Sequence, residues 1–115
     1  MDSIKELTNL ILAFRKARDW EQFHNPKDMS LSLVLEATEV MEHFQWKNPK
    51  QVQEHIKNHH EEIADEIADV FYWVLLMSHD LNIDPVKALN KKLKKNEKKY
   101  PVKKARGRIE KYNNL

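Results

Sequence analysis

Residues 62–77 read EIADEIADVFYWVLLM, a doubled acidic turn that runs directly into an apolar segment. On a helix with about 100° per residue, Glu62, Glu66 and Asp69 fall within an arc of about 60°. Core-type side chains, including Trp73, share that arc. Carboxylates beside a core repel one another and are costly to bury unless a cation or hydrogen bonds compensate them. The stretch therefore predicts a helix whose inward face carries metal-binding acids.

A second acidic turn, Glu36-x-x-Glu39, precedes this stretch. Its two acids lie about 60° apart on a helix and share their face with Leu33 and Val40. Antiparallel packing of the two helices would bring four carboxylates together. An oxygen-only cluster suits Mg²⁺ or Mn²⁺, whereas zinc and iron ordinarily recruit histidine or cysteine. For either turn taken alone, ion pairs on a solvated helix face are the alternative interpretation.

The composition favours one all-helical domain. The 115 residues are 41% hydrophobic, with one glycine and four prolines to interrupt regular structure, and this length suits a single compact domain. The absence of cysteine excludes disulfides and thiolate metal sites. No apolar run approaches the roughly 20 residues that cross a bilayer, and the N-terminus lacks a basic start before an apolar stretch. We therefore expect a cytoplasmic protein without an integral membrane role.

Charge is distributed unevenly along the chain. From Glu36 to Asp69, acidic residues outnumber lysine and arginine nine to three. From Lys87 to Lys111, twelve basic residues accompany only two acids. The acidic middle suits a metal centre, and the basic stretch suits contacts to phosphate groups. A nucleic-acid-binding module that uses the basic stretch is the alternative.

Apolar periodicity and capping signals predict four helices. Asp2 or Ser3 caps the first, Ser30 caps the second and Asp84 caps the fourth. The third is long, and its polar first third is the part most prone to break. The residues from Asp19 to Asp28 form an aromatic-rich loop. The expected helices span about residues 3–18, 30–44, 49–81 and 85–99 of a single domain, 1–115, with a basic tail from about 101.

Three further segments carry a family resemblance. They read RDWEQFH at residues 18–24, FQWK at 44–47 and KYP at 99–101, the last followed by Ala105-Arg106. With the two acidic turns, they closely resemble the MazG-like all-α nucleoside triphosphate pyrophosphohydrolases, in particular the dCTP pyrophosphatase branch, over roughly residues 4–112. We expect an antiparallel four-helix bundle of this type. We also expect a homo-oligomer, a dimer or a tetramer, because so small a bundle would complete its pocket from a neighbouring subunit.

The resemblance identifies four magnesium ligands, namely Glu36, Glu39, Glu66 and Asp69. The tandem repeat leaves a choice of one helical turn, because Glu62 and Asp65 have the same spacing. The second copy is preferred, since the apolar run from Val70 to Met77 follows it directly. Glu36 is then the expected general base that accepts a proton from the attacking water.

The resemblance also implies a nucleotide pocket and phosphate contacts formed by Trp20, His24, Trp46, Lys47, Trp73, Asn96, Lys99, Tyr100 and Arg106. One position departs from the family pattern. Close relatives usually carry tyrosine one turn beyond the motif aspartate, where this chain has Trp73. A tryptophan offers no phenolic hydroxyl, so we expect sugar or base discrimination to differ.

The implied reaction is Mg²⁺-dependent hydrolysis of a nucleoside triphosphate between its α and β phosphates, which yields the monophosphate and pyrophosphate. The resemblance favours dCTP or a modified cytosine deoxynucleotide, and the purpose would be cleansing or balancing of the nucleotide pool. A di-iron bundle is disfavoured, because none of the key acids has histidine three residues later. A catalytically weak helical interaction module is a further alternative.

Overall fold

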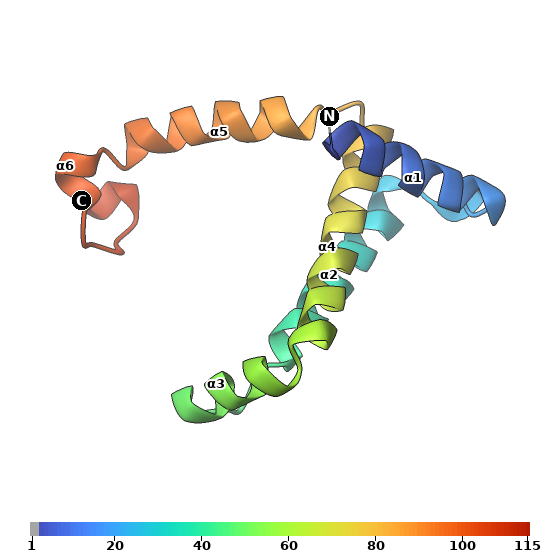
Figure 1. Ribbon diagram of the computed structural model, residues 1–115. Coiled ribbons are helices and arrows are strands. Elements are labelled where there is room, and N and C mark those ends of the chain that lie inside the picture. Colours follow the sequence, from blue (N-terminus) through green and yellow to red (C-terminus); the bar gives the residue numbers. More distant parts are fainter. Residues whose placement is uncertain (1–2) are drawn as a thin grey trace. The chain divides into compact units, whose positions relative to one another are not determined.

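The computed structural model describes residues 3–115, and these residues form helices without a β-strand (Figure 1). The all-helical fold class predicted from the sequence is therefore confirmed. The chain divides into two compact units, Met1–Asn82 and Ile83–Leu115. In chain order, the elements are α1 (Ser3–Ala17), the 3₁₀ turn η1 (Glu21–Phe23), α2 (Pro26–Glu42), α3 (Pro49–Asn58), α4 (His60–Asp80), α5 (Pro85–Lys99), α6 (Val102–Ala105) and η2 (Tyr112–Asn114).

Helix α4 is the centre of the first unit, where it packs against α2, α1 and α3. Leu76 is fully buried, and Ile63 and Leu75 are also buried on this helix. Met29 contributes a buried side chain from α2. Full burial of such a side chain stabilises a fold by about 1.5–3 kcal/mol. Helix α4, which carries the acidic repeat and the apolar segment after it, therefore supplies most of the buried apolar side chains of this unit.

Helix α1 confirms the first predicted helix, although it ends at Ala17. Asp2, one of the two residues predicted to cap it, lies outside the described residues. Ser3 is the first residue of α1 and not a residue before it. No helix within residues 3–115 combines the length and apolarity needed to cross a membrane.

Helix α2 begins four residues earlier than the sequence analysis placed it. The side chain of Asn25 accepts a hydrogen bond from the Asp28 backbone N–H at 2.9 Å, and Pro26 occupies the first turn. Both are strong signals for a helix start. Ser30, the predicted cap, lies inside the helix and donates its hydroxyl to the Lys27 carbonyl. The prediction was wrong because two capping sequences lie close together and periodicity does not choose between them.

The predicted third helix is two helices, α3 and α4, which meet at His59. His59 has φ −127° and ψ 31°, outside the helical range. Its backbone groups stay paired, because its N–H donates to His55 and its carbonyl accepts from Ile63. The α3 segment at the start of the predicted helix is mostly polar. It therefore has no continuous apolar stripe that would prolong the buried face of α4. The break therefore falls where the polar segment meets the apolar one.

The second unit confirms the predicted limits of α5. The Asp84 side chain accepts from the Val86 and Lys87 backbone N–H groups, and the helix ends before Tyr100. Beyond it, the ring of Tyr112 meets that of Tyr100 edge to face, with centroids 6.2 Å apart. The basic tail of this unit contains two short helical segments, α6 and η2. The single domain and the four-helix bundle expected from the sequence stay predictions.

We expect the Asn25→Ala variant to lose about 1 kcal/mol of unfolding free energy, because the first turn of α2 loses its side-chain acceptor. Urea denaturation measures this loss. The matched variant is Ser30→Ala, which removes the cap predicted from sequence. It should change stability by less than about 0.5 kcal/mol. The reverse order of effects would contradict the observed helix start.

Candidate metal centre and adjoining pocket

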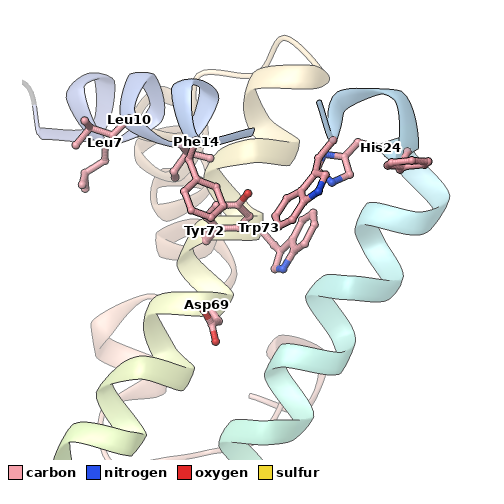
Figure 2. Close-up of a pocket in the computed structure, with 10 residues that line it drawn as sticks. Leu7, Leu10, Phe14, His24, Asp69, Tyr72 and Trp73 are labelled. Atoms are coloured by element: carbon pink, nitrogen blue, oxygen red, sulfur yellow. The ribbon is translucent and has the colours of Figure 1, made fainter. Parts of the chain in front are cut away.

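A pocket of about 680 Å³ opens between α1, the loop that contains η1, and α4 (Figure 2). This volume is within the range of small-molecule binding sites. Three predicted substrate contacts, Trp20, His24 and Trp73, lie in its wall. The complete lining is Leu7, Leu10, Ile11, Phe14, Trp20, Phe23, His24, Asp69, Tyr72 and Trp73.

Aromatic rings pack edge to face along the pocket wall. The centroids of Phe14 and Trp20 are 5.7 Å apart, and those of His24 and Trp73 are 5.3 Å apart. Tyr72 meets Trp73 at 5.2 Å. Edge-to-face contacts of this kind orient each ring plane. The wall is therefore a preformed apolar surface suited to a planar group.

The part of this wall that α1 supplies was not predicted from the sequence. Leu7, Leu10 and Phe14 have the spacing of core residues, yet their exposed fractions are 38%, 67% and 43%. A helical apolar stripe has the same pattern whether it meets a core or lines a pocket. The density of aromatic residues in the following loop was the one signal available, and it identified Trp20 and His24 only.

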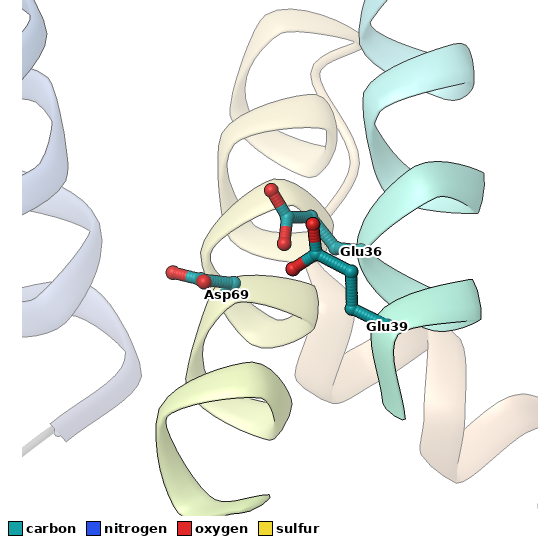
Figure 3. A group of neighbouring side chains, drawn as sticks. All are labelled: Glu36, Glu39 and Asp69. Carbon is teal, nitrogen blue, oxygen red and sulfur yellow. The ribbon is translucent and has the colours of Figure 1, made fainter. Parts of the chain in front are cut away.

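Asp69 links the pocket to a group of carboxylates between α2 and α4. One oxygen each of Glu36, Glu39 and Asp69 lies within 4.8 Å of the other two (Figure 3). The acids meet because α2 and α4 pack together, and because residues three apart share one helix face. The predicted convergence of the two acidic turns is present for these three residues.

Glu66 lies three residues before Asp69 on α4. Its Oε1 is 3.6 Å from Nε2 of His43. The Oε2 atoms of Glu66 and Glu36 are both buried and meet no hydrogen-bond partner within residues 3–115. Buried oxygens without a donor are costly, and a cation coordinated by them would remove that cost. An all-oxygen set fits a hard divalent ion such as Mg²⁺ or Mn²⁺.

Burial and mutual repulsion shift the titration of these acids. Burial, the adjacent Glu39 carboxyl group and the charges of Asp69 and Glu66 raise the pKa of Glu36 to about 7. Burial is also the main cause of the raised pKa of Glu66, with Glu39 adding to the effect and His43 opposing it. Without a cation, the group therefore holds a proton near neutral pH. Binding of a divalent ion would displace that proton.

The first copy of the tandem repeat has different surroundings. Glu62 pairs with His59, and its side chain is 63% exposed. Asp65 is exposed and lies outside the carboxylate group found among the described residues. The structure brings Asp69, from the second copy, to the acids of α2. This geometry agrees with the preferred alignment of the repeat.

Two predicted site residues of the first unit lie outside the pocket. Trp46 is 91% exposed and adopts a φ of 67° in the turn after α2. Lys47 follows it and is half-buried. Neither belongs to the pocket lining. Their assignment as substrate contacts stays a prediction.

The remaining predicted contacts belong to the second unit. Within it, Lys99 Nζ lies 4.9 Å from the centroid of the Tyr112 ring, which also packs against Tyr100. A cation over an aromatic face is a favourable contact. Lys99 and Tyr100 therefore both have Tyr112 as a partner inside their own unit. The roles predicted from the sequence stay predictions for Asn96, Lys99, Tyr100 and Arg106.

An all-helical fold that joins a carboxylate group to an aromatic pocket agrees with the helical nucleotide pyrophosphatases, the class predicted from the sequence. Residues 31–115 match the MazG-like family, and the chain belongs to this family. It is an enzyme, a hydrolase of the nucleoside triphosphate pyrophosphatase type. The family and the enzyme class predicted from the sequence are both confirmed.

The relatives agree with this assignment. The chain is 32% identical over 115 residues to dCTP pyrophosphatase 1 of Rattus norvegicus, an alignment that covers 98% of this chain and 68% of the relative. The Homo sapiens protein of the same name is 31% identical with the same coverage. A pyrophosphatase of Archaeoglobus fulgidus superposes with a TM-score of 0.83 at 33% identity, over 88% of this chain and 94% of that chain.

In metal-free buffer, we expect the thermal midpoint to fall as the pH rises from about 5 to about 8. The pKa of Glu36 is raised to about 7 in the folded protein, so its contribution to stability is present below its unfolded pKa and is lost as the pH passes its folded pKa. The Glu36→Gln variant should flatten this decline.

Differential scanning calorimetry in a chelator measures the effect. Glu42→Gln is the matched control, because Glu42 is exposed on the same helix. It should retain the wild-type dependence on pH. A decline that persists unchanged in Glu36→Gln would exclude repulsion at the carboxylate group as its cause.

Proposed function

We propose that the protein hydrolyses dCTP, or a modified cytosine deoxynucleotide, between the α and β phosphates, with Mg²⁺ as cofactor. The products are the nucleoside monophosphate and pyrophosphate. One observation carries this proposal: Asp69 belongs both to the carboxylate group and to the pocket wall. A nucleoside in the pocket would hold its phosphates beside the acids. The names of the mammalian relatives support cytosine as the base.

Glu36, Glu39, Glu66 and Asp69 are the proposed ligands of Mg²⁺, for which Mn²⁺ is a possible substitute. When bound, the ion supplies charge neutralisation for the phosphate oxygens and lowers the pKa of water. The protein supplies the proton acceptor, for which we propose Glu36. A carboxyl group whose pKa lies near 7 is well matched to general base catalysis at neutral pH. The unpartnered Oε2 of Glu36 supports this role.

The pocket would bind the nucleoside portion. Trp20 and Trp73 offer aromatic surface for the base, and His24 offers a polar ring nitrogen. The exposed aliphatic side chains of α1 would exclude water from the same space. Apolar walls with few polar groups are the usual composition of a small-molecule site.

A homo-oligomer, a dimer or a tetramer, is proposed as the working assembly. Large apolar side chains lie exposed on the two helices that carry the acids, and burial between copies would remove them from water. They are Leu31, Val34 and Leu35 on α2 and Ile67 and Phe71 on α4. A neighbouring copy would also bring phosphate and pocket contacts from Trp46, Lys47, Asn96, Lys99, Tyr100 and Arg106. The corresponding cellular role is cleansing or balancing of the nucleotide pool in the cytoplasm.

The reaction is tested by incubating the protein with Mg²⁺ and each common or modified triphosphate, and identifying products by ion-exchange chromatography. We expect dCMP and pyrophosphate from dCTP, loss of turnover in a chelator, and recovery with Mg²⁺ or Mn²⁺. Glu36→Gln and Glu66→Gln should each lower kcat by at least about 100-fold, because each weakens the metal centre. The control Glu42→Gln should keep wild-type activity.

Two outcomes would contradict the proposal. Release of orthophosphate would mean that a different phosphoanhydride bond breaks. Absence of turnover would favour the interaction-module alternative. A nucleic-acid-binding role for Lys87 to Lys111 would appear as binding that survives Glu36→Gln and weakens steeply with salt.

A change at Trp73 should alter sugar discrimination. The family pattern has tyrosine here, and Trp73 lines the pocket without a hydroxyl group. We expect Trp73→Tyr to change the ratio of kcat/KM for dCTP and CTP by about 5- to 10-fold, the usual worth of one hydrogen bond. Glu42→Gln, at an exposed position of α2 outside the pocket, provides the comparison. An unchanged ratio in Trp73→Tyr would remove this position from sugar selection.

A further inference from the structure

Arg15 is the one buried polar or charged residue among residues 3–115, with 3% exposure. Its guanidinium donates two hydrogen bonds to the Asp80 carboxylate. The distances are 2.7 Å from Nη1 to Oδ2 and 3.0 Å from Nη2 to Oδ1. A two-point contact of this kind fixes the plane of the guanidinium as well as its position. Arg15 on α1 is therefore oriented by a residue at the end of α4.

The same Nη1 lies 3.4 Å from Nδ1 of His24. A guanidinium has only donors and stays protonated in proteins. Nδ1 must therefore be the acceptor and carries no proton, so the neutral ring holds its proton on Nε2. Burial and the charge of Arg15 lower the pKa of His24, while Asp80 and Glu21 oppose this effect. The lowered pKa agrees with a neutral ring.

His24 faces the ligand space of the pocket. It lines the pocket, and its ring packs edge to face against Trp73 (Figure 2). Nε2 has no hydrogen-bond partner among the residues that the structure describes, and it is not sealed from solvent. One oriented N–H donor is thus available to a bound molecule.

We infer that Arg15, held by Asp80, is a positioning residue that fixes His24 as the neutral Nε2–H tautomer, so that the pocket selects a ligand with a hydrogen-bond acceptor at this edge. A pyrimidine carbonyl oxygen has this chemistry. A group that presents only N–H donors would face another donor and bind poorly. The inference rests on the proposed function for the identity of the ligand.

The tautomer is measured first in the unmodified protein. Multiple-bond ¹H–¹⁵N spectra of histidine-labelled protein distinguish the two ring nitrogens, and His24→Gln assigns the signals. We expect Nε2 protonated and Nδ1 unprotonated at neutral pH. A protonated Nδ1 would overturn the inference, whatever the activity of the enzyme.

The double variant Arg15→Met/Asp80→Leu removes the guanidinium and its partner together, because loss of one would leave the other charge unpaired. Circular dichroism verifies its fold. The Nδ1–H form should then appear, and KM for dCTP should rise about fivefold, the usual worth of one hydrogen bond. The value of kcat should stay within about twofold, because the contact is made equally in ground and transition states.

The matched control is Lys16→Met, which removes one positive charge from an exposed position on the same helix. It should leave both the tautomer and KM unchanged. A double variant that keeps the wild-type tautomer and KM would show that Arg15 does not position His24. If unmodified protein does not hydrolyse dCTP, the proposed function fails, whereas the tautomer still decides the role of Arg15.

Discussion

Repulsion among carboxylates at the α2–α4 contact is the constraint on which the other features depend. The two helices pack together and each buries an apolar side chain, Met29 on α2 and Leu76 on α4. Their contact also brings Glu36, Glu39 and Asp69 together. Selection for stability alone would remove acids from this position, since buried oxygens without donors weaken a fold. Their presence beside a core is typical of a site that trades stability for function.

The pocket and the carboxylate group differ in chemistry as the two ends of a nucleotide do. One end of the site is aromatic and aliphatic, and the other end is anionic and suited to a cation. A nucleoside triphosphate has the same division, with a planar base at one end and phosphates at the other. Asp69 is the residue that the two parts share. Helix α4 therefore places the aromatic pocket and the carboxylate group next to each other.

Arg15 forms a second electrostatic arrangement in the first unit, an ion pair with Asp80. It is a buried cation with a partner, whereas two buried oxygens of the acids, Glu36 Oε2 and Glu66 Oε2, have no hydrogen-bond donor among the described residues. The Arg15–Asp80 pair is satisfied within the chain and orients its surroundings. A bound cation would satisfy these two oxygens. Both arrangements arise where other helices meet α4.

The sequence alone determined the helical class, most helix limits, the family and the two acidic turns whose side chains meet. Periodicity and capping chemistry are local, and Glu-x-x-Glu and Glu-x-x-Asp spacings place each pair on one helix face. Local signals failed at Ser30, where Asn25 supplies the cap. At His59 they indicated only that the polar first third of the long helix could break, because no proline or glycine marks the position.

Tertiary structure decided what no local pattern contains. Which turn of the tandem repeat meets α2 depends on how two helices pack, and the apolar face of α1 could cover a core or line a pocket. Arg15 and Asp80 are 65 positions apart in the chain. No sequence motif of short spacing therefore indicates their contact. Distances between helices depend on the packing of many side chains at once, which periodicity along one helix does not record.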